Sequence, residues 1–430
     1  MTTWQEADLS DFISRIESGG RPRGGASEDS GEVPSLGGEN IRLSGGIIYD
    51  SVKKVPTAFF TGLKKGVLKD QDVLINKDGA NTGKVGLYKG EFSIASINEH
   101  LFLLRGNPDK LKQRFLYYLL LSPYGQQVIR SKISGSAQPG LKRNFIRDFP
   151  VSLPSQLQEQ SIIADVIEAV DQAIIQTETL IAKYQRIKTG LMQDLLTRGI
   201  DENDNLRDPA THEFKSSPLG RIPADWTIHN LVDVAFIIDP NPSHRYPPAL
   251  EDGIPLVSTE NFQGANGFDL TKSQYVSNLV FEDQNLRCDF QKTDVVFARK
   301  GRLGFARPYG EKKKVFSHTV VIIKPRNRKV IADYLLWCLR FRDFFEQIDK
   351  RMNSNSGVPT LGIEFLGKVP IRVPHPKEQQ KICDVLNNID QQIEKEYEFL
   401  EKTKRTKQGL MQDLLTGKVS VAPLLENNGN

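Results

Sequence analysis

The sequence GLMQDLLT occupies residues 190–197 and occurs again, letter for letter, at residues 409–416. Eight identical residues are improbable by chance, and two helices of one shape do not need one sequence. The repeat therefore predicts two copies of a surface that fits the same partner. It also gives an offset of 219 residues (409 minus 190) at which the chain can be compared with itself.

Upstream of each copy, apolar residues match at the same offset. Ile163, Ile167, Val170, Ile174 and Ile181 follow one another at steps of four, three, four and seven, a heptad pattern on one face of a helix. Their counterparts are Ile382, Leu386, Ile389, Ile393 and Leu400. Each helix is expected to run for roughly 40 residues, or about 60 Å. Because a small domain cannot cover a stripe of that length, we predict that the two helices pack on each other, antiparallel. The alternative is two unrelated amphipathic helices, and the shared register argues against it.

The segments that precede the two helices also resemble each other. The matching pairs are VPSLGGENI from Val33 with IPLVSTENF from Ile254, DVLINKDGANTGKVG from Asp72 with DVVFARKGRLGFA from Asp294, and SGSAQPGLKRNFI from Ser134 with SNSGVPTLGIEFL from Ser354. Runs such as DVLIN, HLFLLR and DVVFAR predict strands, and QRFLYYLLLS and ADYLLWCLRF predict buried helices. The predicted fold class is mixed α/β (α+β), with two similar globular domains joined by two long antiparallel coiled-coil helices in a pseudo-two-fold internal repeat.

The domain boundaries follow from this repeat. We expect a first globular domain at 1–152, a first spacer helix at 153–199, a linker and second globular domain at 200–372, a second spacer helix at 373–417, and a tail at 418–430. The stretch DENDNLRDPATHEFKSSPLGRIP at 201–223 is rich in Asp, Asn, Pro and Ser, which indicates a linker.

The composition is that of an ordinary globular protein. The 430 residues are 38% hydrophobic and 26% charged, and the net charge of +4 permits nucleic-acid binding without requiring it. No apolar run approaches twenty residues, and the first twenty residues lack a basic region followed by an apolar one, so neither a membrane span nor a signal peptide is expected. Cys288, Cys338 and Cys383 fit no metal-ligand or disulfide spacing, which favours the reduced cytoplasm.

Motifs that suggest catalysis fail on inspection. GANTGKV at 79–85 has three residues between its glycines where a phosphate-binding loop has four, and Val follows its Lys where that loop has Ser or Thr. DPNPSHRYPP from Asp239 has the wrong order for the Asn-Pro-Pro-Tyr signature of adenine methyltransferases. Asp294, Glu311 and Lys313 form a nuclease-like pattern that the first half of the chain lacks. We therefore expect a recognition protein with no catalytic residue, metal or cofactor of its own.

Polar loops between the predicted strands are suited to DNA. Lys and Arg contact phosphates or guanine edges, Asn and Gln suit adenine edges, and glycines let the backbone approach closely. Similar loops lie at matching places in both halves, which strengthens the interpretation beyond an ordinary polar surface. The predicted DNA-binding residues are Lys77, Asn81, Thr82, Lys84, Ser136, Gln138, Arg299, Lys300, Arg302, Asn353 and Asn355.

These motifs, in this order and duplicated, resemble the specificity subunit of type I restriction–modification systems. The segments that carry the resemblance are FKSSPLGRIPADW before the second domain, DVLINKDGANTGKVG, the proline-then-EQ helix starts at Pro154–Gln160 and Pro374–Gln379, and the doubled GLMQDLLT. The resemblance covers essentially the whole chain. Two departures are ARKGRLG in place of NKDGANTG in the second half, and the absence of a Gly-x-Ile-Pro segment before the first domain.

The resemblance implies that each globular domain is a target-recognition domain that reads one half of a split, asymmetric site in double-stranded DNA. The helices would fix the distance between the half-sites and dock two methyltransferase subunits, through Gln193 and Asp194 and through Gln412 and Asp413. ATP-dependent restriction subunits would join the complex. S-adenosylmethionine, ATP and magnesium would be bound on those partners.

Two other functions stay open on the residues alone. A non-catalytic coiled-coil scaffold could use the same loops to bind protein, and a self-sufficient methyltransferase or nuclease is disfavoured by the missing motifs.

Overall fold

The computed structural model describes residues 4–29, 31–135, 139–349 and 360–427. The chain forms two compact units. Unit 1 comprises Met1–Thr179 together with Glu396–Asn430, and unit 2 comprises Leu180–Lys395. Each unit therefore contains a globular domain and parts of both long helices.

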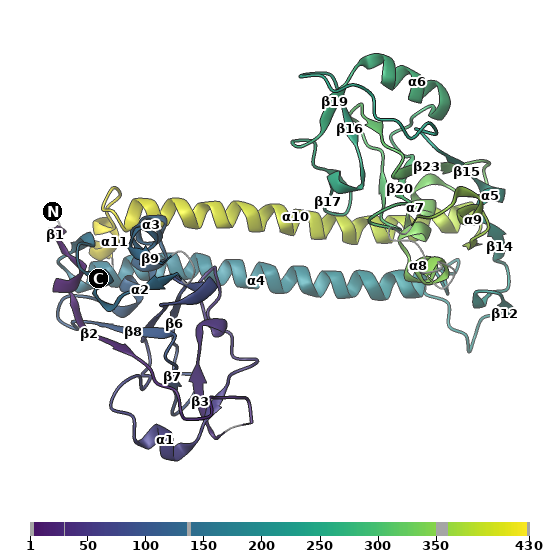
Figure 1. Ribbon diagram of the computed structural model, residues 1–430. Coiled ribbons are helices and arrows are strands. Elements are labelled where there is room, and N and C mark those ends of the chain that lie inside the picture. The colour runs from purple at the N-terminus through teal and green to yellow at the C-terminus, as the bar shows by residue number, and fades with distance from the viewer. Residues whose placement is uncertain (1–3, 30, 136–138, 350–359, 428–430) are drawn as a thin grey trace. The chain divides into compact units, whose positions relative to one another are not determined.

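Unit 1 is built around a four-stranded antiparallel sheet with the order β2-β8-β5-β6 (Figure 1). Its strands are β2 (Ile13–Ser18), β8 (Leu101–Gly106), β5 (Val73–Asn76) and β6 (Val85–Leu87). A second sheet has the order β4-β3-β7, from β4 (Lys54–Val55), β3 (Val33–Leu36) and β7 (Ser96–Ile97), and β3 and β7 are parallel. Strands β1 (Trp4–Asp8) and β11 (Pro150–Pro154) pair antiparallel.

The central sheet of unit 1 is buried on both faces. Val73 and Ile75 of β5 pack in one apolar cluster with the helices α2 (Gln113–Leu121) and α3 (Pro123–Lys132), whereas Leu74 packs in a second cluster with the smaller sheet. Because side chains alternate across a strand, a strand covered on both faces is apolar throughout. This explains why DVLIN and HLFLLR are continuous apolar runs in the sequence.

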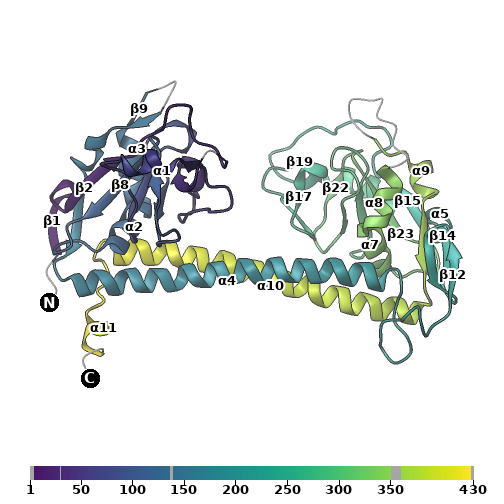
Figure 2. The same cartoon turned by 90° about the horizontal axis from the view of Figure 1, so that it is seen from below.

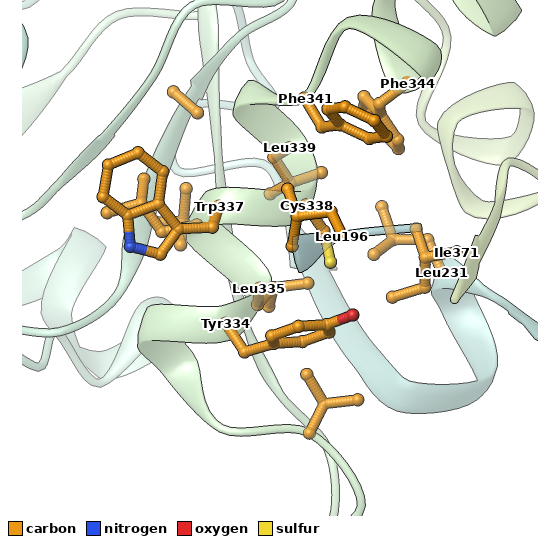
Figure 3. Close-up of a cluster of buried hydrophobic side chains, with 14 of the residues drawn as sticks. Leu196, Leu231, Tyr334, Leu335, Trp337, Cys338, Leu339, Phe341, Phe344 and Ile371 are labelled. Carbon is orange, nitrogen blue, oxygen red and sulfur yellow. The ribbon is translucent and has the colours of Figure 1, made fainter. Parts of the chain in front are cut away.

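Unit 2 repeats this topology. Its four-stranded sheet has the order β15-β23-β20-β21, from β15 (Ala235–Ile238), β23 (Val320–Pro325), β20 (Val295–Ala298) and β21 (Ala306–Pro308). The smaller sheet, β19-β16-β22, consists of β19 (Gln274–Val276), β16 (Ile254–Val257) and β22 (Val315–Phe316), and β14 (Thr227–Asn230) pairs with β24 (Pro370–Val373). Helices α7 (Ala332–Arg340) and α8 (Arg342–Asp349) take the places of α2 and α3. Figure 3 shows Tyr334, Trp337 and Leu339 of α7 in the core of this unit.

The two units differ in their peripheral elements. The eleven-residue helix α6 (Asn278–Cys288) of unit 2 follows the edge strand β19 of the smaller sheet, where unit 1 has only the five-residue α1 (Thr57–Thr61) after β4. Unit 2 also carries a short pair of strands, β17 (Phe262–Gln263) and β18 (Gly267–Phe268). Unit 1 has instead the pair β9 (Ile133–Ser134) and β10 (Gly140–Leu141). Short helices α5 (Leu231–Val234), α9 (Ile363–Gly367) and α11 (Ala422–Asn427) complete the chain.

The long helices α4 (Leu157–Leu195) and α10 (Pro376–Leu414) each have 39 residues and lie side by side (Figures 1 and 2). In unit 1, Asp171 Oδ1 lies 2.6 Å from Lys407 Nζ, and Glu178 Oε1 lies 3.6 Å from Lys404 Nζ. The residue number in α10 falls as that in α4 rises, which confirms the antiparallel arrangement. In unit 2, Lys188 Nζ pairs with Asp390 Oδ1 at 2.5 Å.

The apolar stripe of each long helix is buried against two kinds of surface. Ile163 and Ile167 pack in the core of their own globular domain, and Ile382 and Leu386 do the same in unit 2. We had expected the partner helix alone to cover the stripe. The first three turns of each helix instead complete a domain core, and the buried residues further along include Thr177, Ile181, Ile393 and Leu400.

Each helix start is tied to its domain by the glutamine of the helix-start motif. The buried Gln160 accepts a hydrogen bond from Lys112 N at 2.8 Å and donates from Nε2 to two carbonyl oxygens. Gln379 repeats this pattern with Ile331 N at 3.0 Å. A buried amide that makes all these hydrogen bonds holds three segments together. They are the start of the long helix, the end of the strand before it, and the loop that leads into α2 or α7.

The stretch predicted to be a linker is ordered in part. Strands β12 (Phe214–Ser217) and β13 (Gly220–Pro223) form a hairpin, closed by Gly220 at a φ of +85°. Ile222 of this hairpin is 1% exposed and belongs to the core of unit 2. The polar composition describes the exposed side of the hairpin and does not reveal that Ile222 and Pro223 are buried.

Candidate nucleic-acid interface

Three loops that are distant in sequence meet at one end of the central sheet in unit 1. The loop after β5 lies beside the turn between β7 and β8, because Lys77 N donates to His100 O at 2.9 Å. It also lies beside the segment that leads into β10, because Leu141 N donates to Lys77 O at 2.6 Å and Gly79 N donates to Pro139 O at 3.0 Å. The structure thus brings together two of the loops that the sequence singled out.

The same backbone contacts occur in unit 2. Arg299 N, after β20, donates to Thr319 O at 3.0 Å in the turn between β22 and β23. Leu361 N donates to Arg299 O at 2.8 Å, as Leu141 does to Lys77 in unit 1. The loop scaffold is therefore shared by the units, although the side chains that it carries differ.

In unit 1 the predicted DNA-binding residues have different environments. Lys77 is half-buried, with Nζ 5.4 Å from the centroid of the Phe102 ring. Asn81 and Lys84 are half-buried at the loop surface. The Thr82 hydroxyl donates to Gly79 O at 2.6 Å and lies 3.1 Å from Pro139 O, so it serves the loop itself. Ser136 and Gln138 lie outside the described residues.

In unit 2, Arg299 has a structural role. It is 8% exposed, donates from Nη2 to Asp239 Oδ2 at 2.7 Å and donates from Nε to His318 O at 3.0 Å. Breaking a buried ion pair leaves an uncompensated charge, so this guanidinium is not free to bind DNA. Arg302 is exposed, with one bond from Nη1 to Phe262 O at 3.2 Å, and Lys300 is half-buried. Asn353 and Asn355 lie outside the described residues.

Sequence reasoning missed a fourth loop in each unit, which follows β2 or β15. In unit 1, Arg21 Nη1 lies 3.6 Å from Glu99 Oε1. In unit 2, the ring of His244 stacks on that of His318 with centroids 4.9 Å apart, and Tyr246 meets the same ring edge-on. The signal was present, because GGRPRGG and SHRYPP both place basic residues among Gly and Pro directly after a strand.

The imidazoles at this interface have different surroundings in the two units. Burial, with the nearby charges of His244, Lys300 and Arg299, lowers the pKa of His318 below its usual value, so that ring is neutral at pH 7. In unit 1 the His100 Nδ1 lies 2.6 Å from Asp78 Oδ1. A neutral imidazole offers one donor and one acceptor, which suits a base edge better than a phosphate.

The Glu-Asn pair shared by GGENI and STENF shapes a turn at the same interface. Asn40 Oδ1 accepts from Gly37 N at 2.9 Å, and Asn261 Oδ1 accepts from Ser258 N at 2.9 Å. These asparagines close the short helices at Gly38–Asn40 and Thr259–Asn261 and leave the preceding glutamates exposed. The asparagine is therefore structural, and the glutamate side chain faces solvent.

The repeated GLMQDLLT ends the two long helices, and part of its identity has a packing cause. Leu195 and Leu196 are buried in the core of unit 2, where Figure 3 shows Leu196 beside Ile371. Their counterparts Leu414 and Leu415 are buried in unit 1. A shared sequence is thus partly explained by docking on a shared core, which corrects the expectation that an outside partner alone keeps the copies alike.

Other positions of the repeat have no such cause. Gln193 and Gln412 are exposed, Asp194 accepts from Arg198 Nη1 at 3.2 Å, and Asp413 pairs with Lys418 at 3.4 Å. Gly190 and Gly409 lie inside the helices, exposed, and a Cβ added at either would meet nothing within 4 Å. Glycine inside a helix costs about 0.5–1 kcal/mol relative to alanine. In the part of the chain that the structure describes, no close contact at either glycine offsets that cost.

The described residues hold no group of three or more His, Cys, Asp or Glu side chains that could bind a metal ion. Among them, too, there is no helix both long and apolar enough to cross a membrane. The three cysteine thiols are buried, and burial raises the pKa of Cys288 and Cys338 to about 12. Such thiols are not nucleophiles at neutral pH.

Comparison with known proteins agrees with this architecture. The model of the type I restriction modification DNA specificity domain matches residues 1–188 and 223–402. The chain therefore belongs to this family, as its motifs indicated. It is 24% identical to the MjaVIII type I restriction enzyme specificity subunit of Methanocaldococcus jannaschii, over 98% of this chain and 94% of that protein. It is 25% identical to the putative MjaX specificity subunit of the same organism, over 79% and 76%.

Solved structures support the fold. A crystal structure of a type I restriction–modification S subunit from M. genitalium covers 96% of both chains with a TM-score of 0.62 at 15% identity. A second structure, described as the basis of assembly and conformational transition of a type I system, covers 97% of this chain and 100% of its own, with a TM-score of 0.55 at 18% identity. The two-domain repeat with long helices is thus shared with S subunits.

Proposed function

We propose that this chain is the sequence-specific DNA-recognition subunit of a type I restriction–modification complex, and that it reads a two-part, asymmetric site in double-stranded DNA. The observation that carries the proposal is the loop interface, in which three loops make the same backbone contacts in both units and carry different side chains in each. Equivalent scaffolds with different side chains are what an asymmetric site requires, because each unit has to read its own half.

The charge at each interface suits a polyanion. Lys77 and Lys84 in unit 1, and Lys300 and Arg302 in unit 2, flank the loops. Contacts from such residues to phosphates give binding that is independent of sequence and weakens as salt rises. The polar side chains between them discriminate among bases. We assign no catalytic step to this chain, and adenine methylation and DNA cleavage belong to its partner subunits.

The partners of this chain are two methyltransferase subunits, with restriction subunits joining them. The repeated helix ends support two equivalent docking sites, because they present the same exposed groups in each copy: Gly190 with Gln193, and Gly409 with Gln412. A bare helix backbone allows an outside surface to approach closely. S-adenosylmethionine, ATP and magnesium are expected on those partners.

The test is reconstitution with a methyltransferase subunit of a type I system. The purified chain alone should neither methylate nor cut DNA, and with the methyltransferase it should direct methylation to one bipartite site, read by sequencing methylated adenines. Methylation by the chain alone with S-adenosylmethionine, or methylation by the complex without any sequence preference, would refute the proposal.

The loops can be tested separately by the salt dependence of binding. Replacing a residue that contacts phosphate, as in Lys84→Ala, should lower affinity for all sequences and reduce the slope of log affinity against log salt by about 0.9. Lys110→Ala, at an exposed lysine just before α2, is the matched control and should leave the slope unchanged. Equal slopes for the two variants would exclude Lys84 from the interface.

A further inference from the structure

One position of the shared scaffold differs sharply in chemistry between the units. The turn between β7 and β8 carries Glu99 in unit 1, and the corresponding turn between β22 and β23 carries His318 in unit 2. Both side chains are met by the loop that follows β2 or β15, through Arg21 in unit 1 and His244 in unit 2. Both also hold a buried polar atom without a hydrogen-bond partner among the described residues: Oε2 of Glu99 and Nδ1 of His318.

Glu99 lies in a cleft of unit 1 whose lining includes Ser35, Glu39, Lys53, Asn98 and His100. Its Oε1 is 3.6 Å from Arg21 Nη1 and 3.5 Å from His100 Nε2, whereas Oε2 is buried and has no hydrogen-bond partner among the described residues. The side chain is 33% exposed, so the carboxylate can be reached from solvent. One oxygen is thus turned into the protein without a hydrogen-bond partner among the described residues, and the exposed part of the side chain lines the cleft.

The floor of the cleft is polar in a way that the fold does not require. Ser35 lines the cleft and is the ladder partner of Ser96 in the parallel pair β3 and β7, and the hydroxyls of both are buried without a partner in the described part of the chain. The same ladder position in unit 2 is occupied by Leu256 and Val315. Apolar residues therefore satisfy the fold here, and unit 1 keeps hydroxyls where they cost desolvation free energy.

The neighbouring residues leave room for an approaching group. A Cβ on Gly37 would overlap Glu39 Oε2 and Asn98 Nδ2. Glycine at this position therefore lets the Glu39 carboxylate and the Asn98 amide lie close to the Gly37 backbone. Lys53 Nζ holds Glu39 Oε1 at 2.7 Å. The cleft thus presents acceptors from two carboxylates and donors from Lys53 and Asn98, which is the mixture that a base-pair edge in a DNA groove demands.

We propose that Glu99 is a specificity-determining residue of unit 1, which accepts a hydrogen bond from the amino group at N4 of a cytosine, and that His318 is the specificity-determining residue at the same place in unit 2. This inference rests on the proposed function. A carboxylate can only accept, and among base edges in the major groove its recognised partner is cytosine N4. The exchange of Glu for His on a common scaffold would make the two half-sites differ.

The experiment uses the full chain co-expressed with its methyltransferase subunit, and the readout is the set of methylated adenines across a genome. Glu99→Gln keeps the size of the side chain and presents a donor as well as an acceptor. It should relax one C·G position of one half-site, with discrimination falling roughly five- to hundredfold, and leave the other half-site unchanged. His318→Gln should relax one position in the other half-site only.

Glu91→Gln is the control, because it removes the same charge from an exposed residue of unit 1 that does not line the cleft. It should leave every position unchanged. Thermal unfolding of each variant tests whether it is folded, and Glu99→Asp, which retains the charge but withdraws the carboxylate, gives a second route if Glu99→Gln is unstable. It should weaken methylation at the original site more than at sites changed at that one C·G pair.

The outcomes separate the two proposals. Relaxation at an A·T pair, a uniform loss of methylation with an unchanged site, or no change in any folded variant would overturn the assignment of Glu99 while the bipartite site itself stands. If the unaltered chain directs methylation to no bipartite site, the proposed function fails first.

Discussion

Gly190 and Gly409 allow the packing within the chain to be separated from the docking of a partner. Both lie in the last third of a long helix, and a Cβ at either position meets nothing within 4 Å. Replacing either by alanine should therefore stabilise its own unit by about 0.5–1 kcal/mol, because alanine favours the helix and narrows the unfolded ensemble. For units of this size that corresponds to a rise of about 1–4 °C in the unfolding midpoint.

The effect on docking has the opposite sign. If a methyltransferase surface approaches the bare backbone, an added methyl group forces it away, and overpacking of this kind costs about 1–3 kcal/mol, or roughly five- to hundredfold in Kd. Each single variant should weaken one of two equivalent sites, so Gly190→Ala and Gly409→Ala should each leave one methyltransferase bound tightly. The double variant should weaken both.

The assay combines thermal unfolding of the free chain with a binding titration against the methyltransferase subunit. Gln172→Ala, at an exposed position of α4 outside the repeat, is the control and should leave docking unchanged. A double glycine variant that gains stability and binds two methyltransferase subunits with unaltered affinity would refute the docking interpretation. A loss of stability would refute the structural premise that both positions are open.

Three further predictions concern stability and spacing. The buried carboxylate of Glu378 accepts hydrogen bonds from Trp226 Nε1 at 3.0 Å, from Ile200 N at 2.9 Å and from Arg207. Glu378→Ala should therefore lower the free energy of unfolding of unit 2 by about 3–5 kcal/mol in chemical denaturation. A loss below about 1 kcal/mol would show that the cluster is not a buried ion pair. Burial lowers the pKa of Lys314 from its ordinary 10.5 to about 8, so between these pH values the unfolded chain holds more protons than the folded chain, and the free energy of unfolding should rise with pH. The rise should disappear in Lys314→Met. An identical pH slope in both proteins would contradict the prediction. Deleting residues 176–179 together with residues 401–404 shortens each long helix by about 6 Å. The DNA spacer between the half-sites should then shorten by about one or two base pairs, with the half-site sequences unchanged, in maps of methylated adenines. An unaltered spacer would mean that the helices do not set its length.

The sequence by itself determined the repeat, the two long helices and the main strands and helices of the two domain cores. The heptad steps from Ile163 and the offset of 219 residues suffice for this, because local periodicity reports which face of a helix is apolar. The doubled loops likewise predicted that the recognition surface lies at the ends of matching strands. These are properties of segments a few turns long, and each can be read without knowing what lies beside it.

Tertiary structure alone decided what each side chain touches. The pairing of Arg299 with Asp239, 60 residues earlier in the chain, turned a predicted DNA ligand into a structural ion pair. The first turns of both long helices complete a domain core, which the heptad pattern could not distinguish from a helix–helix seam, because burial against either surface leaves the same apolar stripe. Glu99 was passed over for the same reason: its unpaired oxygen depends on three loops that meet only when the sheet has formed, and pairing across a fold leaves no local signal in the sequence.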